Sequence, residues 1–346
     1  MPRVVISIVA WNSMQHLPEA LASVAAQTFH DLSLIVVDNA SSDGSAEFVR
    51  EKYPQAMVLR NAKNLGFARA HNQAIAYART RLQGDGDLYV LVMNPDAVME
   101  PEYLRTLVEH MERRPEMGSA TGKVKRMVRS QEETSIEGER TDMLDSTGLM
   151  MAKSRRVTDR GEGVRDDGGA FARSEEIFGV SGALALYRMT ALEDVAYGKP
   201  EEYFDDDFFA YKEDADLAWR LRLRGWKALY VPSALAYHYR TAAGAGRSDF
   251  ANLLNRSRKP KIVNFLSYRN HFLLLIKNDS LSNAFLHLPW ILWYELRKLP
   301  AMLLFEPSTL RAIPSALRLL PRMLRKRRFA MKNAAVKPRE IRAWFI

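Results

Sequence analysis

Residues 88–99, LYVLVMNPDAVM, decide the fold of this chain: a run of apolar, partly β-branched residues ends abruptly at Asn94-Pro95-Asp96. Such a run, bounded by turn residues, predicts a strand buried on both faces of a sheet. Pro95 cannot donate to a sheet ladder, so we expect the chain to leave the sheet there. Asn94 and Asp96 then bring two oxygen ligands to the carboxyl end of a strand, where open α/β sheets bind ligands. An ordinary strand-to-turn exit is the alternative, since all three residues also favour turns.

Strand and helix patterns alternate around this stretch. Short apolar runs predict further strands at residues 4–10, 32–37, 57–59, 178–187 and 226–231. Apolar residues at helical spacing, several of them after a Pro or a capping residue, predict helices at residues 18–27, 45–51, 64–79, 101–114 and 214–224. Strands that alternate with helices predict an α/β fold, with a mostly parallel sheet and helices on both faces.

The composition fits a folded protein of one large domain with an appended segment. The chain has 346 residues, 47% of them hydrophobic, which is enough to fill a core. It has no cysteine, which excludes disulfides, zinc–cysteine sites and a thiol nucleophile and indicates a reducing compartment. The apolar N-terminal run leads straight into a polar turn and lacks the length and cleavage site of a signal peptide, so we expect it to form the first strand.

The net charge of +9 is unevenly distributed along the chain. Residues 255–346 contain 19 Lys and Arg against 4 Asp and Glu, whereas residues 1–254 contain 31 against 37. A basic tail can serve nucleic acid, anionic lipid or solubility, so the apolar content of the tail has to decide between them.

Polar side chains also follow the predicted strand at residues 32–37. Asp38 begins a loop that contains Asp43 and Ser45. At the carboxyl edge of the sheet, Asp38 could accept hydrogen bonds from an N–H donor such as a pyrimidine base. In the alternative interpretation Asp38 begins a turn, and Asp43 or Ser45 caps the next helix. Asn64 precedes a later helix whose N-terminus would suit a phosphate, because free N–H groups and the helix dipole favour an anion there.

A third polar cluster surrounds the start of the predicted helix at residues 214–224. Glu213, Asp214 and Asp216 lie in its first turn, and Gly225 closes it. Acids at a helix start also stabilise the dipole, so each of them has an ordinary explanation. Several acids flanked by aromatic residues are harder to explain by solvation alone. His238 follows the next strand at the start of a loop; a lone histidine is usually structural, but this one comes from a strand end.

Residues 125–176 have a different composition, charged and with several glycines. They predict a long mobile loop or insertion, with one short strand near residues 148–152. Loops this long inside a compact domain are usually lids or other functional insertions. An insertion without a role is the alternative.

Six motifs follow one another along residues 4–240: VVISIVAWN at 4–12, DNASSDGS at 38–45, NLGFARAHN at 64–72, VMNPDAVM at 92–99, FGVSGALALYR at 178–188 and FFAYKEDADLAWRLRLRGWKALYVPSALAYHYR at 208–240. Together they resemble the family-2 glycosyltransferases of the GT-A fold, and within that family a bacterial rhamnosyltransferase-like branch. Each motif is weak alone, but six in the expected order make a specific signal over about residues 3–240.

The resemblance implies a donor-binding region. Asp38 would bind the pyrimidine base of a nucleotide sugar, with Asn12 and Asp43 nearby. Asn64 and Gly66, at the start of the third helix, would belong to the same region.

The resemblance also implies a metal site and a catalytic base. Asn94-Pro95-Asp96 takes the place of the family's Asp-X-Asp metal motif, so Asp96 and His238 would bind Mg²⁺ or Mn²⁺ while Asn94 contacts the nucleotide sugar. Asp214 would be the base. Two departures are Asn94, which replaces the motif's first acid, and His71, which stands where many members have an arginine. The residues implied for acceptor binding or site support are Glu213, Asp216, Trp219 and Arg220.

The chemistry of glycosyl transfer needs these residue types. The leaving diphosphate develops charge, and a divalent cation held by few protein ligands and by phosphate oxygens neutralises that charge. The acceptor hydroxyl is a poor nucleophile near neutral pH, so a carboxylate must take its proton as the bond forms. A single base and no enzyme nucleophile predict inversion at the anomeric carbon.

The tail is strongly apolar at residues 271–276, 286–294 and 302–305, but no run approaches the roughly 18 residues of a spanning helix. Residues 310–328 alternate leucines with arginines at helical spacing, which predicts a basic amphipathic helix of the interfacial kind. Packing against the catalytic domain is the alternative. A tail rich in Leu, Trp and Phe suits an anionic lipid surface better than nucleic acid.

Two hypotheses follow. In the first, residues 1–254 are an inverting, metal-dependent glycosyltransferase domain and residues 255–346 a helical, basic membrane-associating segment. The enzyme would move a sugar, with dTDP-L-rhamnose as the first choice of donor, to a glycan or polyprenyl-diphosphate-linked acceptor in cell-surface polysaccharide synthesis. It would be cytoplasmic, peripheral on the inner face of the plasma membrane, and without a nucleic-acid partner.

In the second hypothesis the chain is a catalytically silent GT-A module that acts as a membrane-bound scaffold or sugar-binding partner. A nucleotidyltransferase is a weaker enzyme alternative. The presence of Asp96, Asp214 and His238 speaks against the silent module, while Asn94 in place of an acid keeps it open.

Overall fold

The computed structural model describes residues 3–82, 86–129, 138–239 and 260–346. Its main sheet has ten strands: β1 (Arg3–Ala10), β2 (Leu32–Asp38), β3 (Met57–Arg60), β4 (Leu88–Met93), β5 (Ala97–Met99), β6 (Met117–Val128), β7 (Glu139–Ser146), β10 (Glu175–Ile177), β11 (Leu184–Arg188) and β12 (Lys227–Tyr239). The strand order is β10-β12-β6-β11-β4-β1-β2-β3, with β5 paired to β12 and β7 to β6. β8 (Leu149–Met151) and β9 (Val157–Asp159) form a separate hairpin.

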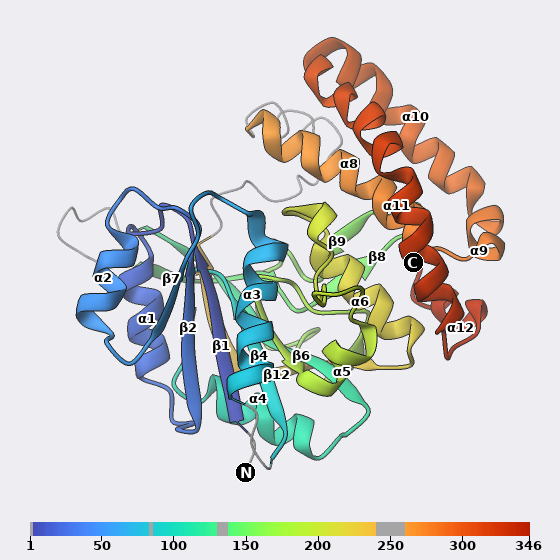
Figure 1. Ribbon diagram of the computed structural model, residues 1–346. Coiled ribbons are helices and arrows are strands. Elements are labelled where there is room, and N and C mark those ends of the chain that lie inside the picture. Colours follow the sequence, from blue (N-terminus) through green and yellow to red (C-terminus); the bar gives the residue numbers. More distant parts are fainter. Residues whose placement is uncertain (1–2, 83–85, 130–137, 240–259) are drawn as a thin grey trace.

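Helices cover both faces of the sheet (Figure 1). They are α1 (Leu17–Ala25), α2 (Ser45–Lys52), α3 (Gly66–Arg81), α4 (Tyr103–Glu112), α5 (Met189–Val195), the 3₁₀ turn η1 (Asp206–Phe208) and α6 (Glu213–Leu223). Apolar side chains of α1, α2 and α4 pack on one face of the sheet, and those of α3, α5 and α6 pack on the other. The predicted α/β fold is therefore confirmed.

The parallel strands at the centre of the sheet end at one edge. β1 pairs in parallel with β2, where Ala10 lies opposite Asp38, and with β4, where Ile8 lies opposite Met93. The loops after these three strands therefore begin side by side. Each strand is buried almost throughout, as the near-continuous apolar runs predict.

The prediction of a long mobile loop over residues 125–176 is wrong for the part of it that the structure describes. β6 extends to Val128 and pairs antiparallel with β7, and β8, β9 and β10 follow. Ion pairs explain how such charged sequence forms strands: Lys125 pairs with Asp142 at 3.3 Å and with Asp166 at 3.1 Å. The charged side chains that resemble a solvated loop are bound to one another along the sheet.

The strand predicted at residues 226–231 is also longer than expected. β12 continues past Pro232 to Tyr239, with a register shift between Val231 and Leu235 that accommodates the proline. Its last residues pair antiparallel with β5, so that His238 lies opposite Ala97. His238 is therefore fixed on a strand and does not begin a loop.

The C-terminal helices form a layer beside α6, coloured orange to red in Figure 1. They are α8 (Lys261–Asn278), α9 (Leu281–Leu286), α10 (Leu288–Phe305), the 3₁₀ turn η2 (Pro307–Arg311), α11 (Ala312–Lys332) and α12 (Pro338–Arg342). Leu273, Met323 and Phe345 from this layer share one apolar cluster with Trp219 of α6. Within the described ranges, no helix has the length and apolar character needed to cross a membrane. The predicted domain boundary at residue 254 lies outside the described residues.

Helix α11 packs through one face and exposes another. Ala312, Ala316, Met323, Lys326 and Ala330 are buried on the side toward α8 and the domain. The predicted apolar positions at residues 313, 317 and 324 are exposed. The helix is amphipathic as expected, and the structure shows both packing against the domain and an open leucine face.

Candidate functional site

The centre of the site is a histidine held between two carboxylates. His238 Nε2 lies 3.1 Å from Asp96 Oδ1, and His238 Nδ1 lies 2.8 Å from Asp145 Oδ2. Asp96 follows β4 at the Asn94-Pro95-Asp96 turn, His238 is the second-last residue of β12, and Asp145 lies on β7. The pairing of β5 with β12 brings Asp96 and His238 together, and these are the two residues that the sequence predicts as metal ligands.

The carboxylates control the charge of this histidine. Burial lowers the pKa of His238, but the charges and hydrogen bonds of Asp96 and Asp145 outweigh it and raise the pKa to about 10. A divalent cation between Asp96 and Nε2 would replace that proton, because a metal-bound imidazole is neutral.

The donor set fits a cation that takes most of its ligands from a substrate. Asp145 binds Nδ1 of His238 and so directs Nε2 toward Asp96, the arrangement by which carboxylates orient metal-binding histidines. Among the described residues, no group of three or more His, Asp or Glu side chains is arranged to hold a metal ion. A cation bound here therefore needs further ligands such as phosphate oxygens.

A short loop connects this turn to the predicted base. The backbone amide of Asn94 donates to the carbonyl oxygen of Ala183 at 2.8 Å, and the amide of Gly182 donates to Asp214 Oδ2 at 3.0 Å. Gly182 also packs against Phe67 of α3, which a Cβ atom at this position would approach to 3.3 Å. The predicted base Asp214, the Asn94-Pro95-Asp96 turn and the start of α3 therefore all contact residues 182–183.

Asp214 has the environment of a general base. It is half-buried in the first turn of α6. Burial raises the pKa of Asp214, although hydrogen bonds from the amides of Gly182 and Ala215 lower it in part. A carboxylate with a raised pKa accepts a proton more readily, which suits the role implied for it.

The other acids and aromatics of this helix have structural contacts. Asp216 is fully buried and accepts hydrogen bonds from Arg220, Lys277 and Asn278. Arg220 also donates to two backbone carbonyls, and Trp219 packs against Phe345. These three side chains support α6 from inside the protein, which agrees with the support role given as one of the two roles implied for them.

Glu213 is different, because it is buried beside Asp214 without a hydrogen bond to its Oε2 among the described residues. Burial and the charge of Asp214 raise the pKa of Glu213 well above its usual range. The raised pKa favours the protonated form of Glu213, whose buried carboxyl accepts a proton less freely than the half-exposed Asp214.

Asp38 lies where the sequence places it, at the carboxyl end of β2. Its Oδ1 accepts a hydrogen bond from the Ser41 amide at 3.1 Å, and its Oδ2 is 3.4 Å from Arg60 Nε. Oδ2 is buried and makes no hydrogen bond within the described residues. Asn12 ties the adjacent loops together, since its Oδ1 accepts from the Ser42 amide at 2.9 Å.

Two residues of the predicted nucleotide-sugar region already bind protein groups. Asp43 accepts hydrogen bonds from the Met14 amide and from Ser45, so it shapes the loop before α2. The N-cap of α2 is Gly44 and no side chain caps the helix, so the alternative interpretation of Asp43 or Ser45 as its cap is wrong. The start of α3 is not an open phosphate site. The Gly66 amide donates to Asn64 Oδ1 at 2.8 Å and the Ala68 amide to the Phe209 carbonyl at 3.2 Å, so these donors already bind protein groups.

His71, the second departure from the family pattern, lies beneath the site. It is fully buried, its Nδ1 is 2.7 Å from Ser7 Oγ, and burial lowers its pKa to about 3. A neutral, buried imidazole makes no ionic contact with a diphosphate. His71 therefore cannot make the ionic contact that an arginine at this position could make with a diphosphate.

Comparison with known proteins identifies the family. A sequence model described as glycosyl transferase family 2 matches residues 5–196. The chain belongs to glycosyl transferase family 2. This glycosyltransferase is 30% identical, over 254 residues, to the N-acetylglucosaminyl-diphospho-decaprenol L-rhamnosyltransferase of Mycobacterium tuberculosis. The matched region covers 71% of this chain and 78% of that protein.

More distant relatives share the fold of the glycosyltransferase. The poly-beta-1,6-N-acetyl-D-glucosamine synthase of Staphylococcus aureus is 23% identical over 66% of this chain and 48% of that protein. The structure of S. aureus TarS 1-349 is similar at a TM-score of 0.53, with 16% identity over 95% of this chain and 88% of that one. GalNAc-T7 with UDP, GalNAc and Mn²⁺ gives a TM-score of 0.56, with 10% identity over 80% and 48%.

One residue of the glycosyltransferase site was missed by sequence reasoning. Asp145 stands in the segment taken for a loop, and nothing in the local sequence distinguishes it from the other acids there. Only the pairing of β7 with β6, itself paired with β12, brings it to His238.

Proposed function

We propose that this glycosyltransferase is an inverting, metal-dependent enzyme that moves L-rhamnose from dTDP-L-rhamnose to a hydroxyl of a polyprenyl-diphosphate-linked sugar in cell-wall polysaccharide synthesis. The observation that best supports this proposal is the hydrogen-bonded set Asp96–His238–Asp145. Residues 182–183 connect this set to Asp214, since the Gly182 amide donates to the Asp214 carboxylate. The choice of donor and acceptor is supported by the Mycobacterium tuberculosis relative, whose name gives an L-rhamnosyl transfer to a diphospho-decaprenol-linked N-acetylglucosamine.

Asp96 and His238 are the residues that would hold Mg²⁺ or Mn²⁺ with the donor diphosphate. The bound ion would supply neutralisation of the charge that develops on the leaving group. Asp145 keeps Nε2 of His238 directed at the ion through its hydrogen bond to Nδ1. The buried Oδ2 of Asp38 offers an acceptor to an N–H group of the pyrimidine.

Asp214 takes the proton of the acceptor hydroxyl as the new glycosidic bond forms. The amides of Gly182 and Ala215 hold its two oxygens, at 3.0 Å and 2.7 Å, and so fix the direction of the carboxylate. Since the sugar passes directly from diphosphate to hydroxyl, its anomeric configuration inverts.

An exposed apolar surface on the C-terminal helices supports a location at the membrane. We name it the α9–α10 apolar face; its exposed members are Phe285, Leu286, Leu288, Trp290, Leu292, Trp293, Leu296, Leu303, Leu304 and Phe305. Phe285, Trp293 and Leu304 are 80%, 67% and 74% exposed. Tryptophan and leucine on one side of a helix are typical of proteins that lie in the headgroup region of a bilayer.

Basic side chains nearby favour anionic lipid as the partner. Arg311, Arg318, Arg325 and Arg328 are exposed and make no ion pair with the described residues. Arg318 and Arg325 directly follow Leu317 and Leu324, so charge and apolar surface alternate along the open side of α11. Each such charge near an anionic surface contributes about 1 kcal/mol. The enzyme would then meet its lipid-linked acceptor as a peripheral protein on the inner face of the plasma membrane.

The first experiment is a thermal-shift panel of UDP-, GDP-, CMP- and dTDP-sugars with Mn²⁺, since a bound donor raises the apparent stability by mass action. We expect the largest shift with dTDP-L-rhamnose. Transfer is then measured with N-acetylglucosaminyl-diphospho-decaprenol, and the anomeric configuration of the product by NMR. A larger shift with another donor overturns the choice of rhamnose. Binding of a donor without transfer to any lipid-linked acceptor would instead support the silent module.

A further inference from the structure

The segment that precedes α6 has an unusual backbone. Phe209, Tyr211 and Lys212 have φ values of 65°, 71° and 70°, in the left-handed region that residues with a Cβ atom rarely adopt. Such conformations persist only where the surrounding structure holds them. Asp214 is the second residue of α6, so the conformation of this segment determines the direction of the α6 axis and the position of its first turn.

Two adjacent side chains of α8 hold this segment, and Arg269 contributes through Nη2, which donates to the carbonyls of Asp207 at 2.8 Å and Phe208 at 3.1 Å. Asn270 of α8 is fully buried, and its Nδ2 lies 2.9 Å from the carbonyl oxygen of Phe208, 2.9 Å from that of Ala210 and 2.7 Å from that of Tyr211. The amide has two hydrogens, which the three carbonyls share. Arg269 donates from Nε to Asn270 Oδ1 at 3.0 Å, which turns the amide nitrogen toward the segment.

The opposite side of the segment is held by α3. The carbonyl oxygen of Phe209 accepts a hydrogen bond from the Ala68 amide at 3.2 Å. Gly66 is required beside it, because a Cβ atom at this position would lie 2.5 Å from that same oxygen. The segment therefore bridges a helix of the catalytic domain and a helix of the C-terminal layer.

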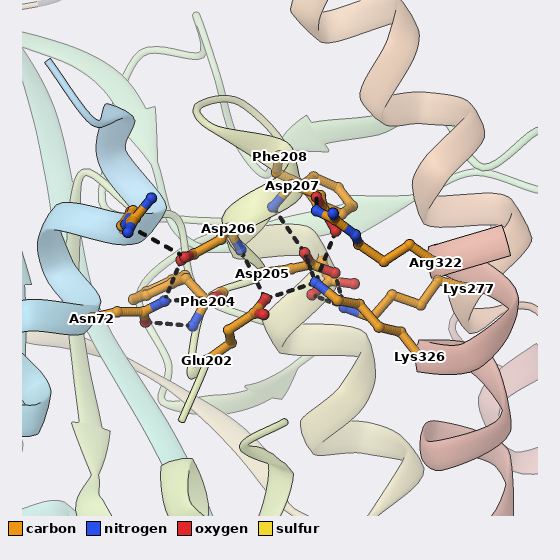
Figure 2. Close-up of polar contacts among 12 residues, drawn as sticks. Asn72, Glu202, Phe204, Asp205, Asp206, Asp207, Phe208, Lys277, Arg322 and Lys326 are labelled. Carbon is orange, nitrogen blue, oxygen red and sulfur yellow. Dashed lines mark hydrogen bonds and ion pairs between the residues drawn. The ribbon is translucent and has the colours of Figure 1, made fainter. Parts of the chain in front are cut away.

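The residues that lead into the segment are fixed by ion pairs, which Figure 2 shows. Asp205 lies 2.6 Å from Lys277 Nζ on α8 and 2.5 Å from Lys326 Nζ on α11. Asp206 accepts a hydrogen bond from Asn72 of α3 at 2.9 Å. With its entry held by these ion pairs and by Arg269, the carbonyls of Ala210 and Tyr211 on the left-handed part of the segment are bound by Asn270.

We infer that Asn270 is a positioning residue for Asp214, which it places by binding the carbonyls of Phe208, Ala210 and Tyr211. This inference rests on the proposed function, in which Asp214 is the base. Without the amide donor the Phe208 carbonyl keeps its bonds from Arg269 and from the Ala210 amide, but the carbonyls of Ala210 and Tyr211 lose the bond that Asn270 gives them. The segment then relaxes, and the first turn of α6 shifts relative to Gly182. A shift of about 1 Å in a reacting group can cost on the order of 10²-fold in rate.

The test compares three variants of the full chain with a matched control. Asn270→Ala removes the amide, Asn270→Asp keeps the shape but cannot donate, and Asn270→Ser keeps one donor. The control is Asn283→Ala, since Asn283 is equally buried in the C-terminal layer but donates to the Pro338 carbonyl, between α9 and α12. Transfer from dTDP-L-rhamnose to N-acetylglucosaminyl-diphospho-decaprenol is followed as kcat, donor KM and the pH profile of kcat, and folding by melting temperature.

We expect kcat to fall about 10- to 100-fold in Asn270→Ala and Asn270→Asp, with partial recovery in Asn270→Ser and donor KM nearly unchanged. The acid limb of the kcat profile should move to lower pH, because a loosened first turn exposes Asp214 to water and reduces the burial that raises its pKa. Asn283→Ala should lower the melting temperature without moving kcat or the profile.

Two outcomes separate this inference from the proposed function. If Asp214→Asn abolishes transfer while the Asn270 variants keep wild-type kcat and pH profile, the positioning role is wrong and the base stands. If Asp214→Asn transfers at the wild-type rate, the base assignment fails and the positioning role fails with it. If Asn270→Ala does not fold, Asn270→Asp decides alone, because it keeps the shape of the side chain and removes only the donor.

Discussion

Nδ1 of His238 lies 2.8 Å from a carboxylate oxygen of Asp145, a residue 93 positions earlier in the chain. This contact fixes the ring so that its other nitrogen faces Asp96. Removal of such a carboxylate typically costs 10- to 100-fold in metal affinity. We therefore expect Asp145→Ala to weaken Mn²⁺-dependent dTDP binding by about that factor, measured by calorimetry. Asp142→Ala is the control, since Asp142 lies on the same strand with an exposed side chain.

Replacement of Asp96 tests the metal site directly. Asp96→Ala removes one of the two side chains proposed to bind the ion, so dTDP binding should lose its dependence on Mn²⁺. The measurement is the dissociation constant of dTDP with and without Mn²⁺. Donor binding whose metal dependence equals that of the wild type would show that the ion binds elsewhere.

Replacement of Asp214 tests the base. Asp214→Asn keeps the shape and cannot take a proton, so kcat should fall by about 10²–10⁴-fold while the donor still binds. In the wild type, the raised pKa of Asp214 means that kcat falls on the acid side at a higher pH than a free aspartate would give, because the base must be ionised. Full turnover in the amide variant would move the base to another residue.

Membrane binding is tested with liposomes. The full chain should bind vesicles that contain anionic lipid, and bind less at high salt. Trp293→Ser with Leu304→Ser should weaken binding through the apolar face, and Arg318→Glu with Arg325→Glu through charge. Arg322 is excluded from this set, because it pairs with Asp207 at 2.5 Å and its reversal would disturb the fold. If all variants bind the vesicles as well as the wild type does, or if the wild type does not bind them at low salt, the proposed membrane association is wrong.

The buried ion cluster predicts a large effect on stability. Lys326 is buried and pairs with Asp205, Glu202 and Asp207. Loss of one partner from such a cluster leaves charges unpaired inside the protein, so Lys326→Met should lower the free energy of unfolding by about 3–5 kcal/mol in urea denaturation. Arg325→Met, on the exposed side of the same helix, should change it little.

The same cluster gives stability a pH dependence. Burial raises the pKa of Asp205, but Lys277 and Lys326 outweigh it and hold the pKa well below its ordinary value of 3.8. The stabilisation is therefore fully present above pH 3.8 and is lost as the pH falls toward the pKa of the folded protein. Urea midpoints measured between pH 5 and pH 2 should fall less in Asp205→Asn than in the wild type.

Local patterns were enough for the central sheet and for the positions of several proposed site residues, whose roles come from the family resemblance. The runs at residues 4–10, 32–37 and 88–93 are apolar because both faces of those strands are covered, and their ends therefore mark the ligand edge. The positions of Asp38, Asp96 and Asp214 could be predicted because each lies near the end of a strand or in the first turn of a helix.

What the sequence could not predict depends on contacts between distant segments. Pro232 looked like the end of a strand, yet a register shift allows β12 to continue to His238. The charged strand β7 looked like a loop because its ion-pair partners come from other parts of the chain. Likewise, α11 was recognised as amphipathic, but only the packing of Lys326 shows which side faces inward.

If the enzyme binds the membrane as proposed, the C-terminal layer also sets the distance between the active site and the lipid. Asn270 binds the backbone next to Asp214, and α8, which carries Asn270, packs against α11, whose open side faces away from the domain. On the proposed geometry, the packed helices α8 and α11 connect the base to the bilayer within the described residues. The distance of an acceptor hydroxyl from the membrane would then decide whether Asp214 can contact it. The enzyme would accept a sugar close to the lipid anchor, and the terminal hydroxyls of longer glycans would lie too far from the bilayer.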